Sequence, residues 1–102
     1  MSVVVVVTAY PKAEHRGAVI AAFKKATGQV HQEPGVEVYA LHEGPDLLVM
    51  IEKYESEEAR SQHAKRPALA DLLTALDGKL RGRLDVQVLT PHPFADPRKG
   101  AL

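Results

Sequence analysis

Five consecutive valines at residues 3–7 constrain the fold of this chain more than any other stretch. Their β-branched side chains are stiff and favour an extended strand. Because neighbouring side chains of a strand point to opposite faces, this strand is apolar on both faces. A strand of that kind is typical of the middle of a sheet. Residues 47–51, Leu-Leu-Val-Met-Ile, are a second apolar run and predict a second central strand.

The remaining segments complete the order of elements. Residues 36–43 and 83–90 alternate between apolar and polar side chains, which is typical of edge strands. Apolar residues spaced three and four apart predict a helix over residues 12–30. Ser56 is a suitable N-cap for a helix that directly follows the second apolar run, and Pro67 suits the first position of a further helical segment. The predicted order is therefore β-α-β-β-α-β.

This order predicts an α+β, ferredoxin-like fold with an antiparallel four-stranded sheet. Helices cover only one face of such a sheet, so the apolar side chains of residues 3–7 need other cover on the opposite face. We expect two sheets to pack face to face in a homodimer, which would form a dimeric α/β barrel. Residues 1–90 are the expected domain, and the proline-containing tail at residues 91–102 is expected to be extended.

The composition excludes several classes of function. Lys and Arg number 13 and Asp and Glu number 13, so no net positive charge is available to hold nucleic acid. The absence of cysteine excludes disulfides, thiolate metal sites and cysteine nucleophiles. The four histidines other than His63 show no metal-ligand spacing, so we expect no metal. No Gly-rich nucleotide-binding fingerprint occurs, and we expect no other cofactor. The N-terminus has no signal-peptide pattern and no run is long enough to span a membrane, so we expect a cytoplasmic protein without a membrane partner.

A carboxylate, two phenols and an imidazole are the candidate site. Glu52 and Tyr54 share a strand face with Met50, and His63 lies about two turns along the next helix. His63 is the candidate base, and apolar walls would raise the pKa of Glu52 and make it a second base or a residue that orients His63. The hydroxyls of Tyr39 and Tyr54 are candidates to hold an oxyanion. The plainer interpretation is a surface histidine, a polar strand end and two core tyrosines.

The chain resembles the antibiotic biosynthesis monooxygenase family over about residues 3–90. The resemblance rests on motifs in matching order and spacing: Glu33-Pro34-Gly35, Tyr39, Glu52-Lys53-Tyr54, Glu58-Ala59 and His63. It implies a ferredoxin-like dimer with a pocket between helices and sheet. We expect His63 and Glu52 to be catalytic there, and a small hydrophobic or aromatic substrate to contact the following side chains: Tyr39, Tyr54, Met50, Phe23, Leu69 and Leu73.

Departures from the family pattern narrow the expected activity. Many members carry a second histidine next to a proline after the helix histidine, whereas Ala68 follows Pro67 here. The haem-degrading branch uses an Asn and a Trp, and this chain has neither. The resemblance then implies a cofactor-independent monooxygenase that oxidises a quinol or an anthrone-like aromatic with dioxygen. A small-molecule binding protein or an isomerase on the same dimeric fold is the alternative, and the sequence does not separate them.

Overall fold

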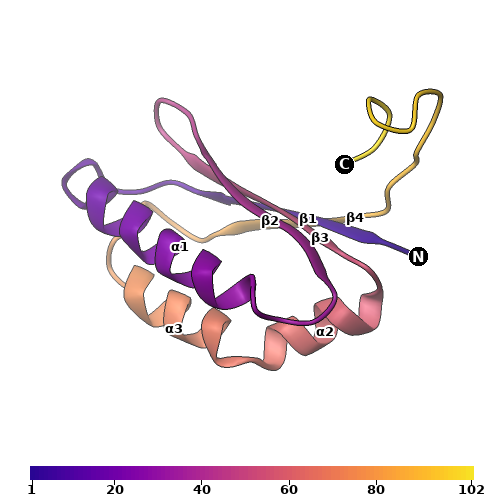
Figure 1. Cartoon of the computed structure of the whole chain (residues 1–102). Coiled ribbons are helices and arrows are strands. Elements are labelled where there is room, and N and C mark those ends of the chain that lie inside the picture. The colour runs from indigo at the N-terminus through magenta and orange to yellow at the C-terminus, as the bar shows by residue number, and fades with distance from the viewer.

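A computed structural model describes all 102 residues of the chain. Its elements are β1 (Val3–Ala9), the 3₁₀ helix η1 (Ala13–His15), α1 (Arg16–Val30), β2 (Val36–Glu43), β3 (Leu48–Tyr54), α2 (Glu57–Lys65), α3 (Pro67–Leu76) and β4 (Asp85–Leu89). The strands form one sheet in the order β2-β3-β1-β4, and every neighbouring pair is antiparallel. The predicted ferredoxin-like α+β fold is confirmed, with the two apolar strands at the centre (Figure 1).

The three α-helices cover one face of the sheet, and the C-terminal tail lies on the other side (Figure 1). The strand register assigns side chains to these faces. Val5 lies opposite Glu52, and Val6 lies opposite Ile51, on the paired strands β1 and β3. Because Glu52 is buried beneath the helices, Val5 shares the helix-covered face and Val6 points to the bare one.

Helices α1 and α3 each contribute one apolar stripe to the core. Helix α1 buries Val19, Phe23, Ala26 and Val30, as the predicted spacing requires. Helix α3 buries Ala68, Leu72 and Leu76, which lie four residues apart. The Leu spacing of this segment also predicts Leu73 in the buried stripe, but Leu73 is 49% exposed. The prediction was wrong for Leu73 because one residue along a helix turns the side chain by about 100° away from the packed row.

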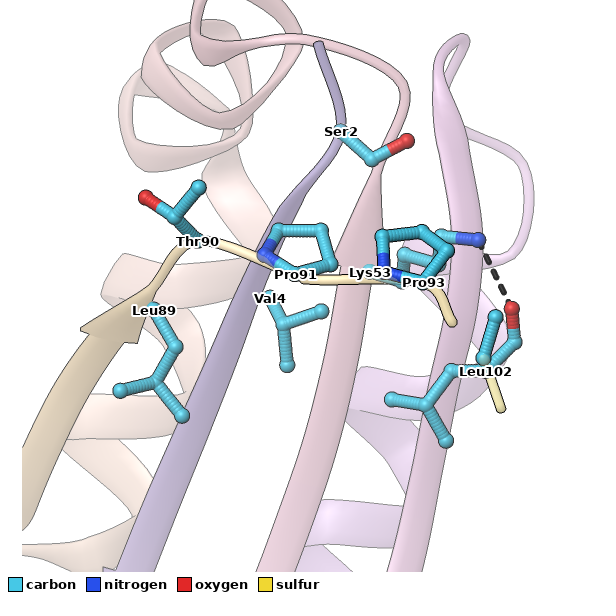
Figure 2. A pocket seen from close by; sticks show the side chains of 9 residues that line it. Ser2, Val4, Lys53, Leu89, Thr90, Pro91, Pro93 and Leu102 are labelled. Carbon is cyan, nitrogen blue, oxygen red and sulfur yellow. Dashed lines mark hydrogen bonds between the residues drawn. The ribbon is translucent and has the colours of Figure 1, made fainter. Parts of the chain in front are cut away.

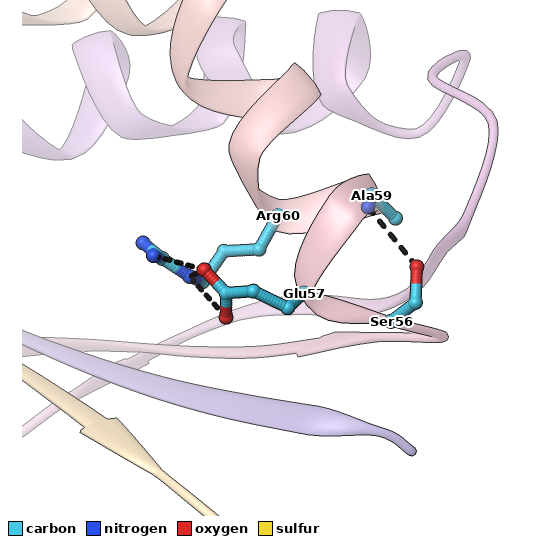
Figure 3. A network of polar contacts seen from close by, with 4 residues as sticks. All are labelled: Ser56, Glu57, Ala59 and Arg60. Atoms are coloured by element: carbon cyan, nitrogen blue, oxygen red, sulfur yellow. Dashed lines mark hydrogen bonds and ion pairs between the residues drawn. The ribbon is translucent and has the colours of Figure 1, made fainter.

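An N-cap residue and a proline determine where α2 and α3 begin after β3. The Ser56 hydroxyl accepts a hydrogen bond from the backbone N–H of Ala59 at 3.1 Å, which makes Ser56 the N-cap of α2 as predicted (Figure 3). Arg66 is extended at φ −85° and ψ 159°, and Pro67 begins α3. The residue before a proline avoids the helical region, so the chain bends there and α3 follows α2 across the sheet.

The tail at residues 91–102 was predicted to be extended, but it is extended in only part of its length. The Asp96 carboxylate accepts hydrogen bonds from the backbone N–H groups of Arg98 and Lys99 at 2.8 and 2.9 Å, which closes a turn. The chain then folds back, and the main-chain oxygen of Leu102 accepts from Lys53 Nζ at 2.8 Å (Figure 2). A hollow of about 260 Å³ separates this loop from the end of the sheet near Val4.

Gly35, in the turn before β2, packs closely against α2. Its φ is +81°, and a Cβ atom there would lie 2.6 Å from the Cβ of Ala59. We predict that Gly35→Ala lowers the free energy of unfolding by roughly 2–4 kcal/mol, because a strained φ and an overlap add together. Gly28→Ala is the matched control, since Gly28 lies inside α1 with no neighbour within 4 Å of such an atom.

The control should raise the free energy of unfolding by about 0.5–1 kcal/mol, because alanine favours helix. Urea titration followed by circular dichroism measures both changes. A Gly35→Ala variant as stable as the parent protein would contradict the close approach of the turn to α2.

Candidate active site

A cavity of about 130 Å³ lies between the sheet and the helices α2 and α3. Its lining is mostly apolar and includes a small group of polar side chains. The 13 lining residues are Val5, Val7, Phe23, Tyr39, Glu52, Tyr54, Arg60, His63, Ala64, Leu69, Leu72, Leu84 and Val86. An apolar cavity with a few convergent polar groups is the usual form of a small-molecule site.

Strand β3 brings a carboxylate and a phenol into this cavity. Glu52 and Tyr54 are two residues apart on the helix-covered face, and both are buried. The Tyr54 hydroxyl donates a hydrogen bond to Glu52 Oε1 at 2.5 Å. Burial raises the pKa of Glu52 above its ordinary value, and the hydrogen bond from Tyr54 opposes this only in part. Burial and the neighbouring Glu52 charge raise the pKa of Tyr54, so its hydroxyl stays protonated at neutral pH.

Helix α2 supplies His63, which is oriented by a residue from the turn before β2. His63 Nδ1 lies 2.9 Å from Glu33 Oε1, and the two side chains are only 8% and 7% exposed. A carboxylate can only accept hydrogen bonds, so His63 Nδ1 carries a hydrogen and donates a hydrogen bond to Glu33. In the neutral ring Nε2 then holds the lone pair. The close approach of Gly35 to Ala59 holds this turn against α2 and brings Glu33 within reach.

Strand β2 supplies Tyr39, the last of the polar side chains that meet at the cavity. It lies opposite Glu52 in the sheet register, and its ring centroid is 5.8 Å from that of His63. The Tyr54 ring lies 5.4 Å from the same imidazole, so both tyrosine rings contact it. Burial raises the pKa of Tyr39 well above its ordinary value, and the charges of Glu52 and Glu33 add to the effect. Tyr39 is therefore a hydrogen-bond donor at neutral pH.

Three polar atoms of this group have no partner within the protein: His63 Nε2, Tyr39 Oη and Glu52 Oε2. No fully buried side-chain nitrogen or oxygen lacks a hydrogen bond in this structure, so each of the three keeps some accessible surface. All three belong to residues that line the cavity. The cavity therefore offers a ligand one lone pair on nitrogen, one O–H donor and one carboxyl oxygen.

Most of the predicted site residues meet in this cavity. His63, Glu52, Tyr39, Tyr54, Phe23 and Leu69 all line it. Met50 does not, because it lies two residues further along β3 from Glu52 and is enclosed by the apolar core. Leu73 does not either, since it faces a separate hollow beside Leu76 and Leu80. Met50 and Leu73, which we expected to contact the substrate, therefore lie outside this cavity.

Two polar residues of the site were missed. Glu33 had been noted only as part of the Glu-Pro-Gly turn, although that motif placed a carboxylate next to a tight turn. Arg60 lies three residues before His63 on α2, and that spacing puts both side chains on one helix face. The spacing was the available signal for Arg60. No group of three or more His, Asp or Glu side chains is arranged to hold a metal ion, and no helix is long and apolar enough to cross a membrane.

Comparison with known families matches residues 2–75 to the family described as antibiotic biosynthesis monooxygenase. This chain belongs to that family. The matched span includes every polar residue of the cavity, from Tyr39 to His63, and also Glu33, the partner of His63. None of the curated proteins compared with the chain matches it.

Solved structures agree with the fold. The Rv0793 protein of Mycobacterium tuberculosis superposes with a TM-score of 0.87 and 26% identity over 94% of this chain and 100% of its own. A Deinococcus radiodurans protein assigned to the antibiotic biosynthesis monooxygenases superposes with a TM-score of 0.84 and 18% identity over 92% of this chain and 96% of its own. A Caulobacter crescentus protein with the same assignment superposes with a TM-score of 0.81 and 21% identity over 86% of this chain and 87% of its own.

The buried Glu52 carboxyl makes the stability of the fold depend on pH. Its folded-state pKa lies above the ordinary value of 4.5, so the folded protein binds this proton more tightly than the unfolded chain does. The stabilising effect is fully present below pH 4.5 and is lost as the pH rises through the folded-state pKa. We predict that Glu52→Gln, which keeps an acceptor for Tyr54, removes this loss and gains stability relative to the parent protein as the pH rises above 4.5.

Urea unfolding at several pH values between about 4 and 8, the range in which carboxyl and imidazole groups titrate, measures the difference between the two proteins. Glu58→Gln is the control, because Glu58 is an exposed carboxylate on α2. A difference between Glu52→Gln and the parent that does not change with pH would contradict the raised pKa.

Proposed function

We propose that this protein is a cofactor-independent monooxygenase that oxidises a small electron-rich aromatic compound, a quinol or an anthrone-like phenol, with dioxygen. The observation that carries the proposal is the buried His63, with Nδ1 held by Glu33 and Nε2 free toward the cavity. Membership of the antibiotic biosynthesis monooxygenase family supports the reaction class, as do the assignments of the Deinococcus and Caulobacter neighbours.

His63 would remove the proton that starts the reaction. Its Nε2 accepts the hydrogen of a phenol or enol, and the Glu33 carboxylate offsets the cost of burying the imidazolium that forms. The free Tyr39 hydroxyl then donates a hydrogen bond to the phenolate oxygen. Glu52 has a raised pKa, so it is suited to return a proton to oxygen later in the reaction.

The substrate itself would supply every electron. The phenolate gives one electron to dioxygen, and the resulting radical pair combines to form a carbon–oxygen bond. Protonation yields a hydroperoxide, whose oxygen–oxygen bond breaks as water leaves. For hydroquinone the sum is one quinol plus one O₂ giving one hydroxyquinone plus one H₂O. Four electrons pass from the quinol to oxygen, so the protein need only supply a base, hydrogen-bond donors and a dry cavity.

The size of the cavity limits what fits inside it. An engineered apolar cavity of about 150 Å³ holds one benzene molecule, so about 130 Å³ suits a single aromatic ring. Leu84 and Val86, at the β4 side of the cavity, are less well covered, and Val86 is 54% exposed. A larger aromatic compound would place its reacting ring beside His63 and extend past β4 toward solvent.

We predict that His63→Gln lowers the rate of oxygen uptake with hydroquinone or anthrone by roughly 100-fold or more, the usual scale for a general base. Glu33→Gln should give a smaller loss, because it removes the charge but leaves a hydrogen-bond acceptor for Nδ1. Lys65→Gln, an exposed change on the same helix, is the control. An oxygen electrode measures the rates, and circular dichroism checks the fold.

Unchanged turnover in His63→Gln would remove His63 from the mechanism. If the parent protein consumes no oxygen with any quinol or anthrone tested, the monooxygenase proposal fails. Stabilisation of that inactive protein by the same compounds would then favour the binding or isomerase alternative.

We also propose a homodimer built sheet to sheet. The bare face of the sheet carries Val6, Val49, Ile51 and Ala40, all only partly covered in the single chain. Burying these side chains would contribute about 1.5 kcal/mol each for the larger ones. Association costs roughly 4–15 kcal/mol, so the edges of the sheet and the tail must add contacts. The tail lies over the Val4 end of this face (Figure 2), and Val6 stays partly uncovered.

We predict that Val6→Asp prevents dimer formation, because a carboxylate at the centre of the interface would be buried without a partner. Analytical ultracentrifugation at about 10 μM, where a stable dimer should persist, should give twice 11.1 kDa for the parent and 11.1 kDa or aggregate for the variant. Ala21→Asp, on the exposed side of α1, is the control and should stay dimeric. A folded parent protein that sediments at 11.1 kDa would overturn the dimer.

A further inference from the structure

Arg60 is the only Lys or Arg among the 13 residues that line the cavity. It lies on α2 one turn before His63, so the two side chains project from the same helix face. The Arg60 side chain lines the cavity and is one-third exposed, so it lies at the boundary between the cavity and solvent. The proton acceptor and this cation are therefore adjacent along one helix face.

We propose that Arg60 binds a carboxylate carried by the aromatic ring of the substrate and so determines which phenols the cavity accepts. This inference rests on the proposed oxidation of a small aromatic compound in this cavity. The substrate class becomes a ring with a phenolic hydroxyl for His63 and an acidic group for Arg60. Arg60 is then a specificity residue, not a proton-transfer group.

The present partner of Arg60 shows that its guanidinium can bind a carboxylate from the outer side. Arg60 Nε donates to both Glu57 carboxylate oxygens at 3.0 and 3.1 Å, and Nη2 donates to Oε1 at 2.5 Å (Figure 3). The Glu57 side chain is 61% exposed. An exposed ion pair of this kind contributes little to stability, so a substrate carboxylate can replace Glu57 at small cost.

The remaining charges of the cavity make Arg60 necessary for an acidic ligand. Glu33 is the carboxylate partner of His63, and its negative charge repels an anionic substituent close to the imidazole. The Arg60 charge acts on this space, since it is one of the influences that lower the pKa of Glu52. A ring that carries one carboxylate is therefore best placed with that group at Arg60 and its hydroxyl at the far end, beside His63.

A pair of probes that differ only in the acidic group tests the inference. Hydroquinone and 2,5-dihydroxybenzoate are titrated into the protein under argon by isothermal calorimetry, so binding is measured without turnover. We expect the parent protein to bind the acid about 10-fold more tightly, and Arg60→Gln to lose this preference while its affinity for hydroquinone stays the same. Glu57→Gln should tighten binding of the acid roughly two- to fivefold by freeing Arg60.

Lys65→Gln removes one positive charge from the exposed surface of the same helix and is the matched control, which should keep the preference. The inference is overturned by a parent protein without a preference for the acid, by a preference that survives Arg60→Gln, or by equal loss of both probes in that variant. Oxygen uptake with hydroquinone is measured separately. A protein that consumes oxygen but has no preference for the acid keeps the proposed function and loses only this inference.

Discussion

The pairing of β1 with β3 is the constraint on which both the cavity and the bare sheet face depend. In the observed register Val5 meets Glu52 and Val6 meets Ile51. A slip by one residue would exchange the two faces, because side chains alternate along a strand. The valines of β1 would tolerate such a slip, since they are equally apolar on either face. Strand β3 would not, because Lys53 would be buried under the helices in place of Glu52, and this asymmetry specifies the register.

Burial shifts the pKa values of the polar side chains at the cavity, and it also costs free energy. Carboxyl, phenol and imidazole groups lose water when the helices close over the sheet, and each must recover hydrogen bonds within the protein. Two contacts meet this need for four of the side chains, from Tyr54 to Glu52 and from His63 to Glu33, whereas the Tyr39 hydroxyl has no partner within the protein. What stays free is one side of each group, where a ligand can bind. The raised pKa of Glu52 records the part of the desolvation cost that these contacts do not offset.

Local patterns were sufficient to predict the strands, their order and the Ser56 cap. The meeting of Glu52 and Tyr54 with His63 was expected from their shared strand face together with the family resemblance at His63. The contact between Glu33 and His63 spans 30 residues and depends on how a turn packs against α2, which no local period encodes. Met50 shares the predicted face of Glu52, but sharing a face does not fix a position along the strand. Leu73 depends on the rotation of α3 about its axis, which tertiary packing alone decides. The folded-back tail likewise arises from side-chain contacts of Asp96 that composition does not reveal.

The two carboxyl groups near His63 are suited to opposite tasks because their partners differ. Glu33 faces Nδ1 of the imidazole, so its negative charge offsets a positive ring and favours proton uptake at Nε2. Glu52 faces the Tyr54 phenol, which carries no positive charge. Burial therefore raises the pKa of Glu52. Proton transfer from a substrate to His63 therefore creates a charge beside a compensating one, and a protonated Glu52 can donate to the oxygen anion that remains. The arrangement separates base from acid within one cavity, which is what a reaction that first removes and later returns a proton requires.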